Sequence, residues 1–351
     1  MRSRGIWLPC FLFLSGCASI SHRVDPPAAF SSGEGCYLER LPAIAQRAYQ
    51  CGPAALESVL RYWAQPADAQ ELRRALITPG ARGVMNFVLA NYPRTQGLWT
   101  EVHQASREDL RAWLRRGIPP IVMLRVGPLG IPTYHFMVVR GFSDPDGIYY
   151  ANVGEAVPHA IHYAAFDRRW KDAGHWCLIV VPGERVDWEL SAAEAGELAQ
   201  LVERAGQLQL AERWYRAALV SDPENQAFQF NLANVYLRLH NWQAATLIYR
   251  DLLEASPQWG AVSNNLAWIA VEEGKPQEAV QLIEQAFLRG AAREYDILDT
   301  LGWAYCRLQQ SQAAQEYFME ALEQLPVQKT EAREMIEQHA AQCASDDGSV
   351  M

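Results

Sequence analysis

The second half of the chain carries a hydrophobic pattern that repeats at intervals of 34, 34 and 35 residues. In each repeat a leucine is followed 13 positions later by an alanine, and a large apolar residue comes four positions after that. The leucines and alanines are Leu198, Leu232, Leu266, Leu301, Ala211, Ala245, Ala279 and Ala314. This spacing predicts pairs of antiparallel helices, in which the small alanine lets the two helices of a pair approach closely. In three of the repeats a proline follows and ends the second helix.

The first half mixes helical and strand-like periods. Helices are expected over residues 51–62, 68–76, 83–92 and 106–116. Strands are expected over residues 121–126, 135–142, 147–153 and 176–181. Asp68 and Ser106 stand where N-terminal caps are needed. Helices first and strands later indicate an α+β domain.

The beginning of the chain has the features of an export signal. Arg2 and Arg4 precede an apolar run over residues 6–14, which is too short to span a bilayer. The following Leu-Ser-Gly-Cys17 resembles the lipobox of bacterial lipoproteins, which implies cleavage before Cys17 and lipid on its sulfur. Ala18 follows where an aspartate would favour the inner membrane, so the expected location is the outer membrane of the cell envelope, facing the periplasm. A secretory signal cut elsewhere is the alternative.

These features divide the chain into four segments. They are a signal peptide (1–16), a lipidated tether (17–35), an α+β domain (36–185) and a repeat array with a C-terminal capping helix (191–345). A length of 351 residues suits two domains. The formal net charge of -9, with no basic stripe, argues against nucleic acid as a partner.

The cysteines and histidines do not suggest a metal site. None of the seven cysteines has Cys-x-x-Cys spacing, and His159 and His162 are too few to hold an ion. Beyond Cys17 five cysteines remain, an odd number that implies at least one free thiol. Cys177 and Cys306 are expected to be buried small hydrophobes, and the spacing assigns no disulfide pair.

The stretch around Cys51 is the most informative part of the chain. Cys51 stands where a loop turns into a helix, and a thiolate there is stabilised by unpaired N–H groups and the helix dipole. Gln46, five residues upstream, carries an amide that can donate to an oxyanion. His135, 84 residues further on, begins an apolar strand and can act as a base. A cysteine hydrolase is therefore the leading hypothesis.

The two motifs, Gln-x4-Cys-Gly-Pro-Ala-Ala-Leu and Tyr-His-Phe-Met-Val-Val-x-Gly-Phe, resemble the bacteriocin-processing, double-glycine-leader group of papain-like cysteine peptidases. The resemblance covers roughly residues 36–182. It implies that Cys51 is the nucleophile, Gln46 the oxyanion donor and His135 the general base, with no metal or organic cofactor. A thiolate–imidazolium pair is the expected resting state.

The third catalytic position departs from the family pattern. The family usually has an aspartate 16 or 17 residues past the histidine, and here Asn152 stands 17 past His135. An asparagine can orient the imidazole by accepting from its ring N–H, as in papain-type sites.

The period of the second half resembles the tetratricopeptide repeat, which implies a curved solenoid with a concave peptide-binding face. The expected fold is thus an α+β papain-like cysteine peptidase domain followed by an all-α tetratricopeptide-repeat solenoid. The expected function is a lipid-anchored peptidase whose repeats hold a peptide substrate or a protein partner. One alternative is a weak or inactive papain-like domain within an assembly scaffold, and another is amide hydrolysis in cell-wall peptide.

Overall fold

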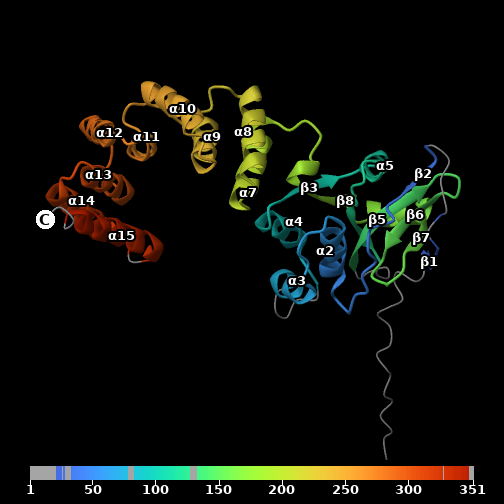
Figure 1. The fold of residues 1–351 in the computed structure, drawn as a ribbon. Helices are drawn as coiled ribbons and strands as arrows, with labels where there is room; N and C mark the ends of the chain where they lie inside the picture. The colour runs from blue at the N-terminus through green and yellow to red at the C-terminus, as the bar shows by residue number, and fades with distance from the viewer. Residues whose placement is uncertain are drawn as a thin grey trace, which may run out of the picture. The chain divides into compact units, whose positions relative to one another are not determined.

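The computed structural model describes residues 21–25, 27, 33–77, 83–126, 133–326 and 328–347. The chain divides into two compact units, Met1–Trp188 and Glu189–Met351 (Figure 1). The expected signal peptide and Cys17 lie outside the described residues. Among the residues described, no helix combines the length and apolar character needed to cross a membrane.

The first unit is built on an antiparallel sheet. Its described strands follow the order β1-β7-β6-β5-β4-β8-β3, and β2 pairs with β5. They are β1 (Ser21–Arg23), β2 (Gly35–Tyr37), β3 (Leu98–Gln104), β4 (Ile121–Arg125), β5 (Tyr134–Ser143), β6 (Ile148–Asn152), β7 (His159–His162) and β8 (Trp176–Pro182). The four expected strands are confirmed as β4, β5, β6 and β8, while β1, β2, β3 and β7 were not expected.

The helices of the first unit cover both faces of this sheet. They are α2 (Cys51–Tyr62), α3 (Ala69–Leu76), α4 (Asn86–Thr95), α5 (Arg107–Arg115) and α6 (Tyr163–Lys171). Helix α2 and Asn152 line one small cavity, so Asn152 faces α2. Tyr149, three positions earlier in β6, points to the opposite face and packs on Phe166 of α6 with ring centroids 4.6 Å apart. Both expected caps are confirmed, at Asp68 and Ser106.

The expected tether contains strand structure, which corrects the boundary at residue 35. Residues Ser21–Arg23 pair with β7, and Gly35–Tyr37 pairs with the end of β5. Arg23 Nη2 also lies 2.8 Å from Glu155 Oε2. Three-residue strands are too short for an alternating pattern, so only pairing with distant strands reveals them.

The second unit consists of helical hairpins, as expected from the repeats. They are α7 (Ala192–Arg204) with α8 (Leu208–Ser221), α9 (Gln226–Arg238) with α10 (Trp242–Ala255), α11 (Gly260–Glu272) with α12 (Pro276–Leu288), and α13 (Tyr295–Arg307) with α14 (Ser311–Gln324). The four repeat alanines have 0% exposure, and the large apolar residues four positions later are also buried. The alanines therefore occupy the close contacts predicted for them.

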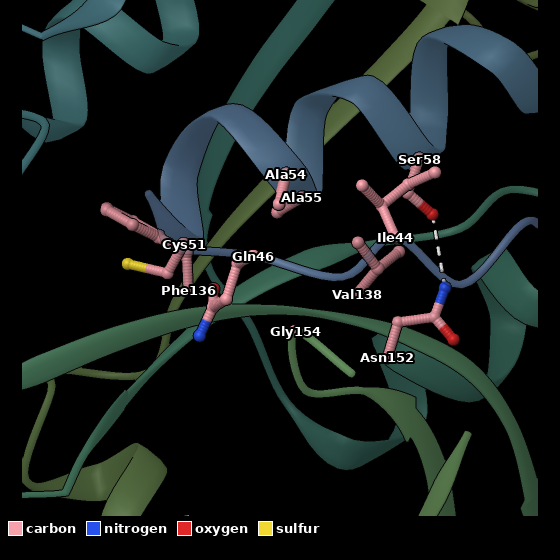
Figure 2. A pocket seen from close by; sticks show the side chains of 10 residues that line it. All are labelled: Ile44, Gln46, Cys51, Ala54, Ala55, Ser58, Phe136, Val138, Asn152 and Gly154. Carbon is pink, nitrogen blue, oxygen red and sulfur yellow. Dashed lines mark hydrogen bonds between the residues drawn. The ribbon is translucent and has the colours of Figure 1, made fainter. Parts of the chain in front are cut away.

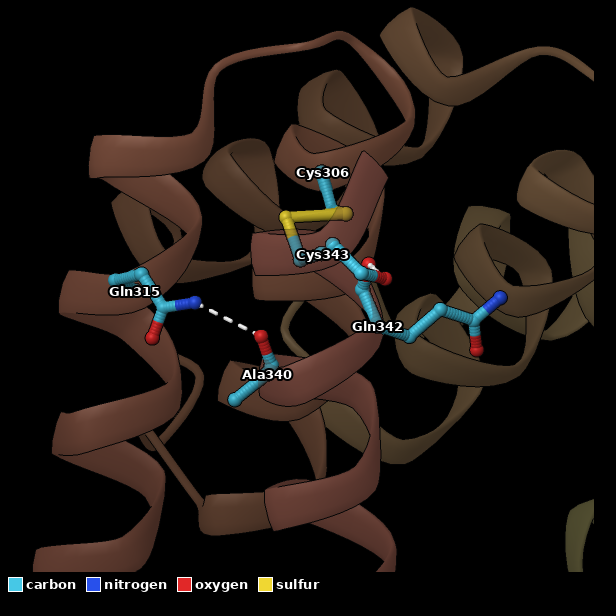
Figure 3. Close-up of a disulfide and its surroundings, with 6 residues drawn as sticks. Cys306, Gln315, Ala340, Gln342 and Cys343 are labelled. Carbon is cyan, nitrogen blue, oxygen red and sulfur yellow. Dashed lines mark hydrogen bonds between the residues drawn. A yellow bond between two sulfur atoms is a disulfide. The ribbon is translucent and has the colours of Figure 1, made fainter. Parts of the chain in front are cut away.

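A last helix, α15 (Thr330–Asp347), closes the array. A disulfide joins Cys343 in α15 to Cys306 in α13 (Figure 3). Gln315 Nε2 of α14 also donates to the main-chain oxygen of Ala340, at 2.9 Å. Cys306 is buried as expected, and it forms a disulfide that the cysteine spacing did not assign. Cys36, Cys51 and Cys177 are free.

Candidate active site

Cys51 is the first residue of α2, as predicted from its sequence position. The main-chain N–H groups of Phe136, Gly52 and Cys51 itself lie close enough to the sulfur to lower its pKa. Phe136 directly follows His135 in β5, so the Cys51 sulfur lies against the peptide unit that joins those two residues. The fold thus brings the start of α2 and the start of β5 to one place.

The thiol of Cys51 is partly shielded from solvent, and this decides its protonation. Burial raises the pKa of Cys51, and the three N–H groups lower it by less, so the net direction is upward. The site at rest therefore favours the neutral thiol of Cys51. A thiolate must be generated by proton removal.

Gln46 lines the same cavity as Cys51 and is fixed by Gly154. The Gln46 N–H donates to the Gly154 main-chain oxygen at 2.9 Å. Gly154 has φ +89°, and a Cβ built there would overlap the side-chain amide of Gln46. The Gln46 Oε1 atom is buried without a hydrogen-bond partner in the described structure. Figure 2 shows Gln46 and Cys51 at one end of the cavity and Asn152 and Ser58 at the other.

His135 is 8% exposed, and its Nε2 lies 3.1 Å from the main-chain oxygen of Val153. A carbonyl oxygen can only accept, so Nε2 carries a proton and, in the neutral ring, Nδ1 carries the lone pair. Burial lowers the pKa of His135, and the bond to Val153 raises it by less. The neutral imidazole with an available Nδ1 is the form required of a general base.

The expected resting ion pair is not supported by these directions. Burial moves the pKa of Cys51 up and the pKa of His135 down, so each group is held neutral. Among the described residues no hydrogen bond joins the Cys51 sulfur to the His135 ring. A papain-like thiolate–imidazolium pair was expected from the resemblance. The structure differs because the Cys51 thiol and the His135 ring are both desolvated, with little charge nearby to compensate.

In the described structure Asn152 forms no hydrogen bond with His135, which corrects the expectation for the third catalytic position. Its Nδ2 donates to Pro42 O at 2.9 Å and to Ser58 Oγ at 3.1 Å, and its Oδ1 accepts from Arg140 at 3.1 Å. Strand geometry explains this outcome. Asn152 pairs directly with Val138, so the two share a face of the sheet and line the cavity against α2, where Asn152 lies at the Ser58 end and not at the Cys51 end.

Arg140 is a buried neighbour of Asn152 that the sequence did not reveal. It lies between Val139 and Gly141, where the register of β5 against β6 shifts by one residue. Arg140 is 4% exposed, and its Nη2 donates to Leu38 O at 3.0 Å. Its guanidinium also lies 4.6 Å from the ring centroid of Tyr37. An arginine within an apolar strand was the available signal, but its partners are 12 or more residues away.

The cavity between α2 and the sheet has a volume of about 10 Å³, about the space of one water molecule. A peptide therefore has to bind outside it, at the end where Cys51 and Gln46 lie. In the described part of the chain no group of three or more His, Cys, Asp or Glu side chains could hold a metal ion.

Residues 38–177 match the family model described as Peptidase_C39 like family. The matched part of the first unit is similar to the C39-like peptidases, and we call it the C39-like domain. Residues 295–324, which contain α13 and α14, match the tetratricopeptide repeat. The C39-like domain is thus joined to tetratricopeptide repeats in a single chain.

Several solved structures are similar to part of the chain. A MamA fragment from Desulfovibrio magneticus RS-1 is 13% identical, covering 46% of this chain and 97% of its own length, with a TM-score of 0.35. A tetratricopeptide repeat protein from Parabacteroides merdae is 21% identical, covering 44% and 60%, with a TM-score of 0.36. No curated protein matches the chain.

Proposed function

We propose that the C39-like domain is a thiol peptidase that cleaves peptide bonds through Cys51. The observation that supports this most directly is the meeting of the α2 N-terminus with the start of β5. It places a cysteine sulfur on the peptide unit that follows a buried, neutral histidine. Gln46 lies at the same end of the cavity and supplies an amide for the oxyanion.

In the proposed reaction His135 Nδ1 takes the proton of the Cys51 thiol as the sulfur attacks the substrate carbonyl carbon. The resulting oxyanion accepts hydrogen bonds from Gln46 Nε2 and the Cys51 N–H. His135 then returns the proton to the leaving amine, and a thioester remains on Cys51. Water, deprotonated by the same ring, hydrolyses the thioester and restores the thiol.

The neutral resting state of Cys51 and His135 determines when the proton moves in this mechanism. Because both groups are held neutral, proton transfer accompanies attack instead of preceding it. Catalytic hydrogen bonds often tighten only when substrate binds, and substrate would also exclude water from the exposed end of the site.

The tetratricopeptide repeats would hold the substrate protein or a partner, and a lipid on Cys17 would place both units at the envelope surface. The lipobox-like sequence before Cys17 supports this anchor. The test is metabolic labelling with a palmitate analogue. We expect labelling of the full chain and its loss in Cys17→Ser, and a Cys17→Ser chain that stays labelled would contradict the anchor.

The test of the peptidase uses Cys36 as a matched control. Cys36 is also free and half-buried, and burial raises its pKa as well. We expect a peptide-like thiol electrophile to modify Cys51 faster than Cys36, and His135→Ala to remove the difference. In cells, Cys51→Ala should change the termini of envelope proteins while Cys36→Ala should not. Equal modification of both cysteines, unaffected by His135→Ala, would contradict the proposal.

A repeat-based scaffold with a weak or inactive C39-like domain is the second candidate. The raised pKa of Cys51 favours it, because a thiol held neutral reacts slowly without an efficient base. The test is complementation of a deletion strain. If a Cys51→Ala chain restores every phenotype, while a chain with disrupted repeats does not, the scaffold is the better account.

A further inference from the structure

The orientation of the His135 ring depends on a group other than Asn152. All the hydrogen bonds of the Asn152 amide go to Pro42, Ser58 and Arg140. Its side chain lies at the Ser58 end of the cavity, away from Cys51 and Gln46. A ring that must deliver Nδ1 to a sulfur still needs an acceptor for its Nε2 proton.

We propose that the main-chain carbonyl of Val153 is the group that orients His135, and that Asn152 is a positioning residue that fixes this carbonyl. The proposal rests on the proposed function for its catalytic meaning. The bond itself is the 3.1 Å contact between Nε2 and Val153 O, with both residues buried.

The Val153 carbonyl is held in place from both sides. On one side the Asn152 side chain is bonded to the buried Arg140 and to the α2 residue Ser58. On the other side Gly154 O accepts the Gln46 N–H at 2.9 Å. A carbonyl between two anchored residues can act as a fixed acceptor, which is the property that an orienting side chain has in related sites.

A main-chain acceptor differs from a carboxylate in its effect on the ring. It carries no charge, so it selects the Nε2–H tautomer without strongly favouring the imidazolium. This agrees with the lowered pKa of His135. The chain would therefore orient its base through geometry, while burial keeps that base neutral.

The first test reads the tautomer directly in the intact chain. The full-length protein is labelled with 15N-histidine, and the signals of His135 are assigned with His135→Gln. Two-bond 1H–15N correlations then report which ring nitrogen is protonated. We expect the neutral ring to be protonated at Nε2. Protonation at Nδ1, or rapid exchange between both forms, would overturn the proposal.

The second test weakens the carbonyl alone. Replacing Gly154 by glycolic acid turns the Val153–Gly154 amide into an ester, whose carbonyl is a poorer acceptor, and adds no side chain at the crowded position. We expect the Nε2–H signal to move toward that of a free ring, and the modification rate of Cys51 to fall about 2- to 10-fold, the equivalent of one weakened hydrogen bond. Unchanged ring signals would overturn the proposal.

Asn152→Asp is the comparison variant. It keeps the acceptor for Arg140 but loses the Nδ2 donor to Pro42 and Ser58, and it places a carboxylate at the position expected from the family pattern. We expect the Nε2–H tautomer to persist and the titration of His135 to move little. A strong rise in the pKa of His135 would show direct contact and overturn the proposal. Because the tautomer is read without substrate, failure to cleave any peptide would count against the peptidase only.

Discussion

The two units of the chain are stabilised by different kinds of contact. In the C39-like domain the buried polar groups join residues far apart in sequence, as where Asn152 bonds to Ser58 and Pro42, 94 and 110 positions away. In the repeats the close contacts come from alanines and aromatic residues within one or two helical hairpins. A substitution in the first unit should therefore affect several residues of its site, whereas a substitution in the repeats should affect only neighbouring helices.

The largest effect is expected at the long-range covalent link of the repeat unit. The disulfide between Cys306 and Cys343 closes 37 residues. Cys343→Ser should lower the free energy of unfolding of the repeats by about 3–4 kcal/mol, because a cross-link of this size restricts the unfolded chain. Denaturant unfolding measures this, with Cys36→Ser as the control. A loss equally large in the reduced wild type would agree, and no loss would show that α15 is held by its side-chain contacts alone.

The next effect compares two asparagines. Asn152→Ala removes an acceptor from the buried Arg140 and the donor that Pro42 O and Ser58 Oγ share, so it should destabilise the C39-like domain by about 3 kcal/mol. Asn234 accepts from Tyr249 and Asn265 in the repeats, and all three groups are neutral. Asn234→Ala should cost about 1 kcal/mol. Equal losses in denaturant unfolding would break the distinction between the units.

A smaller effect is expected from pH on the C39-like domain alone. Burial lowers the pKa of His135 in the folded state, so the unfolded chain binds its proton first as pH falls. The stabilising contribution is complete above the ordinary histidine pKa and is lost as pH falls toward the folded value, with a slope of at most about 1.4 kcal/mol per pH unit. Stability curves should therefore be flatter in His135→Gln below neutral pH. Parallel curves for the two proteins would contradict this.

The smallest effect should be the same in both units, because it is local. Ser106 is the N-cap of α5 and Ser191 is the N-cap of α7, and each forms a capping box with the acidic residue three positions on. Ser106→Ala and Ser191→Ala should each cost about 1 kcal/mol in the free energy of unfolding of their own unit. A much larger cost for either would mean that the serine supports more than its own helix.

Local patterns in the sequence predicted local structure well. The repeat alanines, the caps at Asp68 and Ser106 and the strands around His135 depend on neighbours a few residues apart, and all are confirmed. The same reasoning missed β3 and α6, and it placed the edge strand β1 in a tether. Pairing of such segments depends on distant partners, which one sequence does not identify.

The candidate site was predicted only in part. The position of Cys51 follows from a helix start, which is a local feature. The partners of Asn152 follow from strand register, and the buried Arg140 follows from the register shift between β5 and β6. The acceptor for His135 is a main-chain oxygen, and every residue has one, so no side-chain motif could have marked Val153.

The approach of Gln46 to Gly154 has a consequence for how this site can change. Residues 152–154 form one short tripeptide that touches both working groups, since Val153 meets the His135 ring and Gly154 meets Gln46. Its last member has a left-handed backbone and no room for a side chain. Base and oxyanion donor therefore share a support, and mutation of that tripeptide would alter acid–base chemistry and anion binding together rather than tune either one separately.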